Sequence, residues 1–446
     1  MQRDAMNALL AWKDNPSRKP LMLFGARQVG KSYLLEEFAK KSYQSYALLN
    51  LEQSGNLRDA FEGELSPKTI LANLSQLTHM SLPKSDTLIV LDEIQASPNA
   101  ITSLKYFQEQ LPEQPIIGAG SLLGVAVRER GASYPVGKVD TLTLRPMTFN
   151  EFLVGIGEEA LLGGIQDAYE HEIAYPLHER AMELYRTYLL VGGMPEAVKT
   201  YRETRDTREA VRVHHAVLDL YLTDMAKYAQ NPTDIAKARD AWLSMPAQLA
   251  KENHKFQYKT IRRGARASRY EGALEWLLAA GLTTRCVRVS SGQVPLALRE
   301  DASSFKMYVN DTGLLCTMSE IPHTALFEDR LRPLLDMGGI TENYVSQQLV
   351  AQGITPRYWT SGNTAEVDFV VEDGSAQAVP IEVKSTTHVR SKSLGVYASA
   401  YQPTCCVRIS ARNFGWSDPV VSVPLYAVDV LANDLARSRQ SAGILT

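Results

Sequence analysis

Cysteine is scarce in this chain of 446 residues, and the four cysteines form no CxxC pair. This spacing argues against a zinc ribbon or a disulfide framework, and it fits a reducing compartment. Long apolar runs are missing too, since no stretch approaches the roughly 18 uncharged apolar residues that a membrane helix needs. The opening residues, MQRDAMNALLAWKDN, lack the continuous apolar core of a signal peptide. We therefore expect a cytoplasmic protein without a membrane partner.

The sequence also lacks an excess of charge of either sign. It has 47 Lys and Arg against 50 Asp and Glu, which gives a formal net charge of -3. This balance excludes an acidic tail and a globally basic nucleic-acid binder, so any basic surface must be local. The hydrophobic share of 45% is that of an ordinary globular protein. The length suggests about three domains, and therefore several cores.

A strand, a glycine-containing loop and a helix follow one another near the start of the chain. Residues 20–24 (PLMLF) form an apolar run, and GARQVGKS and the helically spaced YLLEEFAKK come next. The octet fits G-x-x-x-x-G-K-[ST], in which backbone N–H groups wrap phosphates at a helix N-terminus. Lys31 can reach the outer phosphates, and the Ser32 hydroxyl can bind Mg²⁺. The alternative is a glycine-rich turn without a nucleotide.

ATP and Mg²⁺ are therefore the expected cofactors of this loop. The residues expected to contact the nucleotide are Gly25, Ala26, Gln28, Val29, Gly30, Lys31 and Ser32.

A second apolar strand ends in two carboxylates. The run Thr87 to Leu91 is typical of a buried parallel strand, and Asp92 and Glu93 follow it. Open α/β sheets place their chemistry at such strand ends. We expect Asp92 to hold Mg²⁺ through water, and Glu93 to orient or deprotonate the attacking water. Taken alone, such a pair is more often a helix N-cap, but here it follows a phosphate loop.

A third strand, PIIGAGS, ends at Ser121. Its hydroxyl is expected to sense the γ-phosphate, and a simple strand-end cap is the alternative. A cation could complete the phosphate site in cis or from a neighbouring subunit, and the sequence does not choose among the candidates. These candidates are Arg128, Arg130, Lys138 and Arg145.

Several further motifs follow in order: LDEIQ, SLKYF, GSLLG, PVGK, TFNEFL and YLLVGGMPEAV. With GARQVGKS, they resemble the large bacterial and archaeal group of AAA-type ATPases whose C-terminal half is a domain of unknown function. The resemblance extends over nearly the whole chain, and it implies ATP binding and hydrolysis. In that family the position of Lys138 is usually arginine, and this chain departs from the pattern with a lysine that keeps the charge.

The middle of the chain is helical, and a basic segment follows. Residues 160–245 have apolar positions three and four apart and predict a helical lid or adaptor. From residue 255, a short helix, a turn at Gly264, a longer helix and two β runs follow in winged-helix order. Residues 255–310 hold ten Lys or Arg against four Asp or Glu, a local charge of +6 that suits DNA phosphates. The arginines at the start of the second helix are Arg262, Arg263, Arg266 and Arg269. The alternative is a module for packing or protein contact.

The last hundred residues have the order helix, strand, strand, helix, strand. This is the core order of the restriction-nuclease fold. Along a strand, residues two apart share a face, so Glu382 and Lys384 project together, with Asp368 opposite on the preceding strand. Two carboxylates can bind Mg²⁺ or Mn²⁺ to activate water, and the lysine can stabilise the developing charge. Glu342 on the preceding helix could complete the ligand shell.

These four residues resemble the site of the PD-(D/E)xK superfamily of restriction-nuclease-like domains. Here Val367, and not proline, precedes Asp368. Two alternatives remain at this point. Cross-strand pairs of opposite charge also stabilise sheets, and such folds also occur as inactive binding modules.

The predicted fold class is α/β, with a P-loop NTPase parallel sheet, a helical and winged-helix middle, and a C-terminal restriction-endonuclease-like domain. The expected domains are an AAA-type P-loop ATPase at 1–155, a helical lid or adaptor at 156–250, a winged-helix-like domain at 251–325 and a restriction-endonuclease-like domain at 326–446. The expected function is a Mg²⁺-dependent ATPase coupled to a DNA-binding winged helix and a metal-dependent nuclease-like domain. The alternative is a nucleotide-dependent regulatory or scaffold protein whose last domain binds without cutting. DNA is the expected partner besides ATP, and association between copies of the chain is left open.

Overall fold

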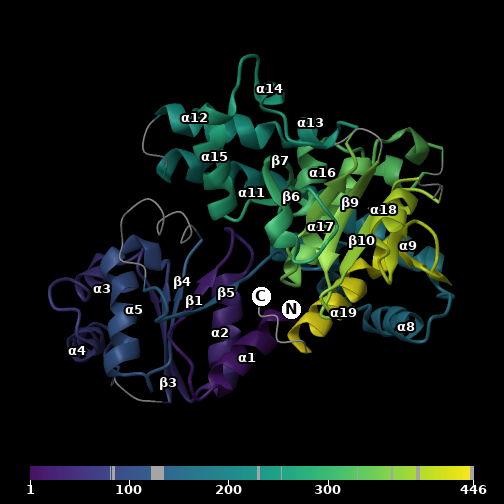
Figure 1. Cartoon of the computed structure of the whole chain (residues 1–446). Coiled ribbons are helices and arrows are strands. Elements are labelled where there is room, and N and C mark those ends of the chain that lie inside the picture. Colours follow the sequence, from purple (N-terminus) through teal and green to yellow (C-terminus); the bar gives the residue numbers. More distant parts are fainter. Residues whose placement is uncertain are drawn as a thin grey trace. The chain divides into compact units, whose positions relative to one another are not determined.

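The computed structural model describes residues 1–80, 82, 86–121, 135–228, 232–252, 254–328, 330–362, 365–387 and 392–441 (Figure 1). The chain divides into two compact units. We call them the N-terminal unit, Gln2–Arg145 with Ala279–Leu282, and the C-terminal unit, Met1 with Pro146–Leu278 and Thr283–Thr446. Among the described residues, no helix combines the length and the apolar character needed to cross a membrane.

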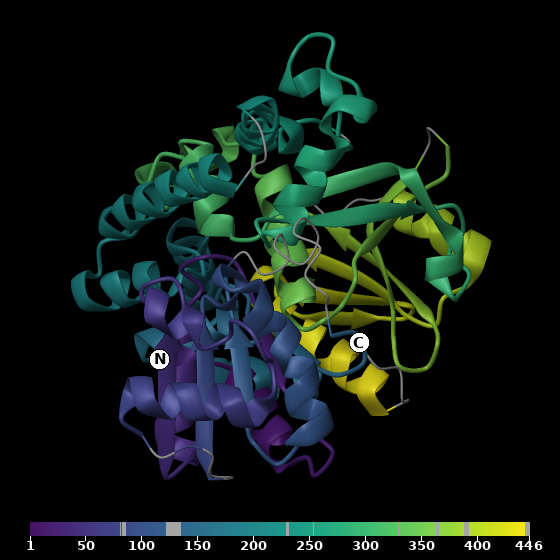
Figure 2. The same cartoon turned by 90° about the vertical axis from the view of Figure 1, so that its left-hand side faces the viewer.

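The N-terminal unit is built on a five-stranded sheet in the order β2-β3-β4-β1-β5. All of its neighbouring strands are parallel. Figure 2 shows this sheet, in purple to blue, among helices of the same colours. The strands are β1 (Leu21–Phe24), β2 (Ser45–Asn50), β3 (Thr87–Asp92), β4 (Ile116–Ala119) and β5 (Asp140–Thr143). The helices are α1 (Ala5–Asp14), α2 (Lys31–Ser42), α3 (Gly55–Asp59), α4 (Pro67–Thr78) and α5 (Pro98–Gln110).

The three strands predicted in this unit are present, because their apolar runs are long enough to be covered on both faces. The first five residues of β3 and all of β4 are buried. Met22, Leu91 and Ile116 share one core with apolar residues of the helices, including Ile70 and Leu104. The predicted α/β class and the parallel central sheet are confirmed for this part of the chain.

The C-terminal unit begins with helices, as predicted for residues 160–245. A capping box starts the first of them, since Thr148 Oγ1 accepts from the backbone N–H of Glu151 and the Glu151 carboxylate accepts from that of Thr148. The helices up to the basic segment are α7 (Phe149–Ile156), α8 (Glu159–Glu170), α9 (His178–Val191), α10 (Pro195–Thr204), α11 (Thr207–Tyr228), α12 (Pro232–Leu243) and α13 (Met245–Leu249). Those that follow are α14 (Tyr258–Ile261), α15 (Ala267–Ala279), α16 (Thr312–Met318), α17 (Gly338–Ala351), α18 (Ser393–Tyr401) and α19 (Val428–Ser441).

An eight-stranded sheet in the order β12-β13-β11-β10-β9-β8-β6-β7 forms the rest of the unit. The strands are β6 (Thr283–Val289), β7 (Glu300–Val309), β8 (Arg357–Thr360), β9 (Glu366–Glu372), β10 (Ala378–Val383), β11 (Cys406–Ser410), β12 (Gly415–Ser417) and β13 (Val420–Pro424). The predicted helices and strands are present as α17, β9, β10, α18 and β11, but the structure has one strand more than expected, β8, between α17 and β9. Strands β9 and β10 are antiparallel, and β10 and β11 are parallel.

The two strands expected to form the wing of a separate domain belong to this sheet. They pair with each other in antiparallel fashion, as predicted, but β6 also pairs in parallel with β8. An unpaired strand edge exposes N–H and C=O groups, and β8 satisfies those of β6. The segment 251–325 therefore shares a sheet with residues 326–446, and the chain has two compact units where four segments were expected.

The glycine pair of YLLVGGMPEAV lies in a buried polar contact of the C-terminal unit. The backbone N–H of Gly193 donates to Asp311 Oδ2 at 2.6 Å, and the Gly193 carbonyl accepts from Met147 N at 2.7 Å. A Cβ atom on Gly193 would lie 2.1 Å from the Met147 carbonyl oxygen, so only glycine fits. Burial raises the pKa of Asp311 to about 6. This motif is accounted for by packing.

Candidate functional site

The predicted phosphate loop connects β1 to α2 and requires glycine at both ends. Gly25 has a φ of 150° and Gly30 a φ of 91°, values that residues with a side chain rarely adopt. A Cβ atom on Gly25 would also lie 2.4 Å from the Leu144 carbonyl oxygen, which follows β5. The sequence thus forms a tight loop whose backbone opens onto the N-terminus of α2, the geometry that cradles phosphates.

The ammonium group of Lys31 lies inside this loop. It donates to the carbonyl oxygens of Gly25 at 2.9 Å and of Ala26 at 2.8 Å. Only 6% of the residue is exposed. Burial lowers the pKa of Lys31 to about 8, although the nearby Glu93 and Asp92 favour its charged form. A buried ammonium of this kind gains from an anionic ligand.

Ser32 and Asp92 meet, as expected of two residues that share one metal ion. The Ser32 hydroxyl donates to Asp92 Oδ2 at 2.7 Å, and Asp92 Oδ1 accepts from the backbone N–H of Glu93 at 3.0 Å. Strands β1 and β3 run in the same direction, so the loop that leads from β1 to Ser32 and the end of β3 at Asp92 lie at one edge of the sheet. A hydroxyl and a carboxylate are oxygen ligands of the kind that Mg²⁺ takes, directly or through water.

Glu93 is held in a left-handed conformation at the end of β3, with a φ of 50°. Its Oε2 atom accepts from Gln95 Nε2 at 2.5 Å and from the Ser121 hydroxyl at 3.3 Å. Ser121 is predicted to sense the γ-phosphate, and in this structure it contacts the carboxylate that would orient water. The sequence prediction did not include Gln95, although it stands in the quoted motif LDEIQ.

The cation candidates differ in their surroundings. Lys138 forms an ion pair of 3.1 Å with Glu109 of α5. Burial lowers the pKa of Arg145, which lies two residues after the end of β5. Arg128 and Arg130 lie outside the described residues. These surroundings therefore do not identify which of the four cations would complete the phosphate site.

This fold and this loop define a P-loop nucleotide-binding domain. Residues 17–153 match the family model described as "AAA domain", which supports an AAA-type ATPase. Residues 182–325 and 337–427 match two families that are each described as a domain of unknown function, DUF8612 and DUF4143. No curated protein matches the chain.

Solved structures that match part of the chain include a Walker-type ATPase of Pyrococcus abyssi, at 15% identity and a TM-score of 0.42, covering 71% of this chain and 95% of that one. The ORC2 protein of Aeropyrum pernix in ADPNP–ADP complexes has 14% identity and a TM-score of 0.35, over 73% and 92% of the two chains. The ORC1 protein of the same organism in complex with DNA has 16% identity and a TM-score of 0.31, over 73% and 94%. At these TM-scores, the likeness is too weak to assign an activity.

The carboxylates predicted on β9 and β10 are brought together in the C-terminal unit. Ile381 pairs with Phe369 in the antiparallel ladder, so Asp368 and Glu382 are opposite each other on one face of the sheet. Asp368 Oδ2 also accepts from the backbone N–H of Val383 at 2.8 Å. Burial and the nearby Glu342 raise the pKa of Asp368, while Lys306 and Lys384 oppose this rise.

Glu382 and Lys384 share a face, as predicted. Lys384 Nζ lies 3.0 Å from Glu382 Oε1. Burial alone would lower the pKa of Lys384, but Asp368 and Glu382 raise it. Only 3% of Glu382 is exposed, and its Oε2 atom is buried without a hydrogen-bond partner among the described residues. An unpaired buried carboxylate oxygen is costly, and a cation beside it would relieve that cost.

Glu342 of α17 lies in a different environment. Its Oε1 atom is 2.8 Å from His254 Nδ1, and its Oε2 atom accepts from Lys306 Nζ at 3.1 Å and from the Tyr308 hydroxyl at 2.9 Å. Burial alone would raise the pKa of Glu342, but Lys306 and His254 lower it. Lys306 also pairs with Glu366 Oε1 at 2.7 Å.

The three predicted metal ligands Glu342, Asp368 and Glu382 do not form one group of ligands in the structure. Over the ranges that the structure describes, no group of three or more His, Cys, Asp or Glu side chains is placed to hold a metal ion. Asp368, Glu382 and Lys384 come together, whereas Glu342 is bonded to Lys306, His254 and Tyr308. The sequence prediction missed these partners, which lie on other elements. The one available signal was a lysine inside the apolar run FKMYV.

The four arginines of the basic segment are exposed at the turn before α15 and in its first residues, namely Arg262, Arg263, Arg266 and Arg269. The guanidinium group of Arg262 lies over the ring of the buried Tyr270, 5.9 Å from its centroid. The guanidinium groups of the other three arginines form no ion pair with a carboxylate in the described part of the chain. This surface is therefore open to an anionic partner.

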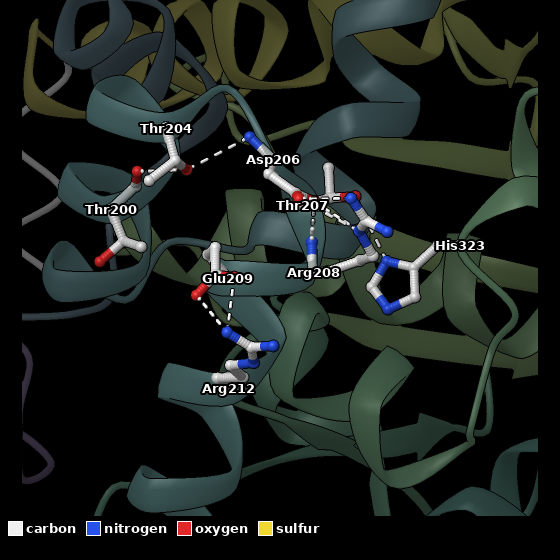
Figure 3. Close-up of polar contacts among 8 residues, drawn as sticks. All are labelled: Thr200, Thr204, Asp206, Thr207, Arg208, Glu209, Arg212 and His323. Carbon is white, nitrogen blue, oxygen red and sulfur yellow. Dashed lines mark hydrogen bonds and ion pairs between the residues drawn. The ribbon is translucent and has the colours of Figure 1, made fainter.

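The polar side chains at the start of α11 pair mainly with one another (Figure 3). Arg208 pairs with Asp206 at 2.7 Å, and Arg212 pairs with Glu209 at 2.6 Å. The Thr207 hydroxyl lies 3.2 Å from His323 Nδ1, beside a cavity of about 320 Å³. Because these charges are paired with one another, the cluster fits the stabilisation of a helix start and does not by itself indicate a ligand site.

Proposed function

We propose that the chain is a Mg²⁺-dependent ATPase whose nucleotide state controls a DNA-binding, metal-dependent nuclease-like unit. The match of residues 17–153 to the AAA domain supports the ATPase part. The finer parts of the proposal are DNA binding by the basic segment and phosphodiester cleavage at the charged face of β9 and β10.

In the N-terminal unit, each residue of the candidate nucleotide site would have its own role in catalysis. Ser32 and Asp92 would hold Mg²⁺, which when bound neutralises charge on the phosphates. Lys31 would exchange its bonds with the loop carbonyls for the outer phosphate oxygens. Glu93 would orient the attacking water and accept its proton, while Gln95 and Ser121 fix the position of its carboxylate.

In the C-terminal unit, Asp368 and Glu382 would hold a divalent cation, which when bound activates water for attack on a phosphodiester. Lys384 would stabilise the negative charge that develops on the phosphate or position the water. One observation carries this part of the proposal: Glu382 Oε2 is buried and unpaired within the described structure, next to Lys384 and opposite Asp368. A buried carboxylate oxygen without a partner is costly, and a bound cation would offset this cost.

DNA is the substrate that the charge distribution favours. The segment 255–310 carries a local charge of +6, in a chain whose net charge is -3. Its four exposed arginines stand where a winged helix would meet a phosphate backbone. The match to a domain of unknown function over residues 182–325 neither favours nor opposes this assignment.

The test is cleavage of DNA by the full chain. Plasmid and linear DNA would be incubated with protein and Mg²⁺ or Mn²⁺, in the presence of ATP, ADP or no nucleotide. We expect metal-dependent cleavage that Lys384→Ala and Asp368→Asn abolish, and that Lys199→Ala, at an exposed lysine of α10, leaves unchanged. If no metal-dependent cleavage occurs under any nucleotide condition, the nuclease part is wrong, and a regulatory or scaffold role is favoured.

A further inference from the structure

We propose that Lys306 is a fixed cation of the candidate metal site. Lys306 holds the carboxylates of Glu342 and Glu366, and it thereby limits the site to a single divalent ion bound by Asp368 and Glu382. This inference rests on the metal site of the proposed function, and it assigns to Lys306 and Glu342 roles that differ from those of metal ligands.

Lys306 lies in β7 and has no contact with solvent. Its relative exposure is 0%, and it pairs with Cys286 of the neighbouring strand β6. The ammonium nitrogen lies 2.7 Å from Glu366 Oε1 and 3.1 Å from Glu342 Oε2, and it sits 5.2 Å from the ring centroid of Tyr358. A buried ammonium group persists only where its surroundings replace its hydration, and here two carboxylates and an aromatic face do so.

Both oxygens of the Glu342 carboxylate are already engaged by other side chains. Its Oε1 atom is bonded to His254, and its Oε2 atom accepts from both Lys306 and Tyr308. Glu382 shows the opposite situation, because one of its oxygens is buried and unpaired in the described part of the chain. The ligand oxygens available to a cation therefore belong to the sheet face of Asp368 and Glu382.

The charged side chains of the site are unequal in number. Four carboxylates (Glu342, Glu366, Asp368 and Glu382) face two lysines (Lys306 and Lys384) within the described residues. A bound divalent cation would offset part of this excess of carboxylates. Sites with two metal ions need carboxylates that bridge the ions, and Lys306 holds two of the four carboxylates here.

The strand that carries Lys306 comes from the expected wing. Because β6 and β7 extend the same sheet as β9 and β10, a residue of the basic segment becomes part of the charged face. A purely structural lysine in the core would stabilise the fold without changing how many metal ions bind. The number of bound ions therefore separates the two roles.

The experiment counts Mn²⁺ bound to the full chain without nucleotide, from the electron paramagnetic resonance signal of free Mn²⁺. We expect one tightly bound Mn²⁺ per wild-type chain, and none in Asp368→Asn. Lys306→Met should bind a second Mn²⁺ at saturation, because it frees carboxylates and leaves the site one charge more negative. The control Lys199→Met, at an exposed lysine of α10, should still bind one.

Different results contradict different claims. Two Mn²⁺ in the wild-type chain, both lost in Asp368→Asn, would overturn the role of Lys306 and leave the metal site intact. No bound Mn²⁺ in the wild-type chain would overturn the metal site itself, and the nuclease part of the proposed function with it. A single Mn²⁺ in a folded Lys306→Met variant would show that Lys306 is only structural.

A second variant keeps the test decisive if Lys306→Met does not fold. Glu342→Gln keeps the size of the side chain and removes its charge. If Glu342 serves Lys306 and not the metal, this variant still binds one Mn²⁺, with an affinity within about threefold of the wild type. A loss of affinity of tenfold or more would identify Glu342 as a metal ligand and overturn the inference.

Discussion

The hydroxyl group of Ser32 donates a hydrogen bond of 2.7 Å to Asp92 Oδ2, which joins the start of α2 to the end of β3. Strand β4 lies between β1 and β3 in the sheet, so the contact spans the carboxyl edge of three strands. This edge is where α/β sheets place their ligands. The contact fixes one point at which a hydroxyl and a carboxylate can share a magnesium ion beside the phosphate loop.

Glu93→Gln should separate ATP binding from ATP hydrolysis. The amide keeps the size of the side chain but cannot accept a proton from water, so hydrolysis should fall by about 10² to 10⁴ while the affinity for ATP stays near the wild-type value. Phosphate release and isothermal titration calorimetry measure the two quantities. Glu36→Gln, on α2 and paired with Lys40, is the matched control and should be unaffected. Undiminished hydrolysis by Glu93→Gln would exclude Glu93 as the base.

ATP binding should take up a proton at alkaline pH. In the free protein, burial lowers the pKa of Lys31 to about 8, and phosphate oxygens favour the charged form and raise this pKa. At pH 8, about half of the lysines are unprotonated, so binding should take up about half a proton. Near pH 7 the uptake should become small, and above pH 8 the affinity should fall as pH rises. Calorimetry in buffers of different ionisation enthalpy measures the uptake, and an uptake that is the same at pH 6.5 and pH 8.5 would contradict this account.

Arg263→Ala should weaken DNA binding in a salt-dependent way. Each phosphate contact that is lost lowers the slope of log K against log salt by about 0.9, without changing sequence preference. Fluorescence anisotropy at several salt concentrations gives this slope. Arg208→Ala is the control, because that arginine is also exposed but pairs with Asp206 at the start of α11. Equal slopes for the wild type and Arg263→Ala would remove this residue from the DNA interface.

Gly193→Ala should destabilise the C-terminal unit by about 3 kcal/mol, because the added methyl group would strike the Met147 backbone and disturb the buried contact with Asp311. Gly163→Ala in α8 is the matched control. Nothing lies within 4 Å of its Cβ position, so it should be neutral or stabilising by up to about 1 kcal/mol. Urea denaturation followed by circular dichroism measures both variants. Similar midpoints for the two would refute the packing role of Gly193.

The local structure of the candidate nucleotide site could be predicted from the sequence because its parts are contiguous. The run PLMLF, the loop GARQVGKS and the start of α2 are contiguous, and their residue types specify strand, turn and helix. The carboxylates of the second strand could be placed because parallel strands end at one edge of the sheet. The contact between Ser121 and Glu93 could not be foreseen, since it depends on the side-chain conformations at that edge.

The candidate metal site was predictable only in part. Alternation along β10 places Glu382 and Lys384 on one face, and the hairpin with β9 brings Asp368 opposite them. The partners of Glu342 come from distant parts of the chain, and only the parallel pairing of β6 with β8 brings β7 into the same sheet. Sequence periodicity does not specify pairing between distant strands, so the role of Lys306 and the shared sheet emerge only from the structure.

The most direct test of the central claim is equilibrium binding of Mg²⁺ and ATP to the full chain, comparing Lys31→Ala with Lys41→Ala. Both lysines belong to α2, but Lys31 is buried in the phosphate loop, whereas Lys41 is exposed and pairs with Glu37. The account predicts wild-type affinity for Lys41→Ala and a loss of at least about a hundredfold for Lys31→Ala, because charged hydrogen bonds to phosphate are lost. Equal affinity of the two variants for ATP would contradict the assignment of the phosphate loop.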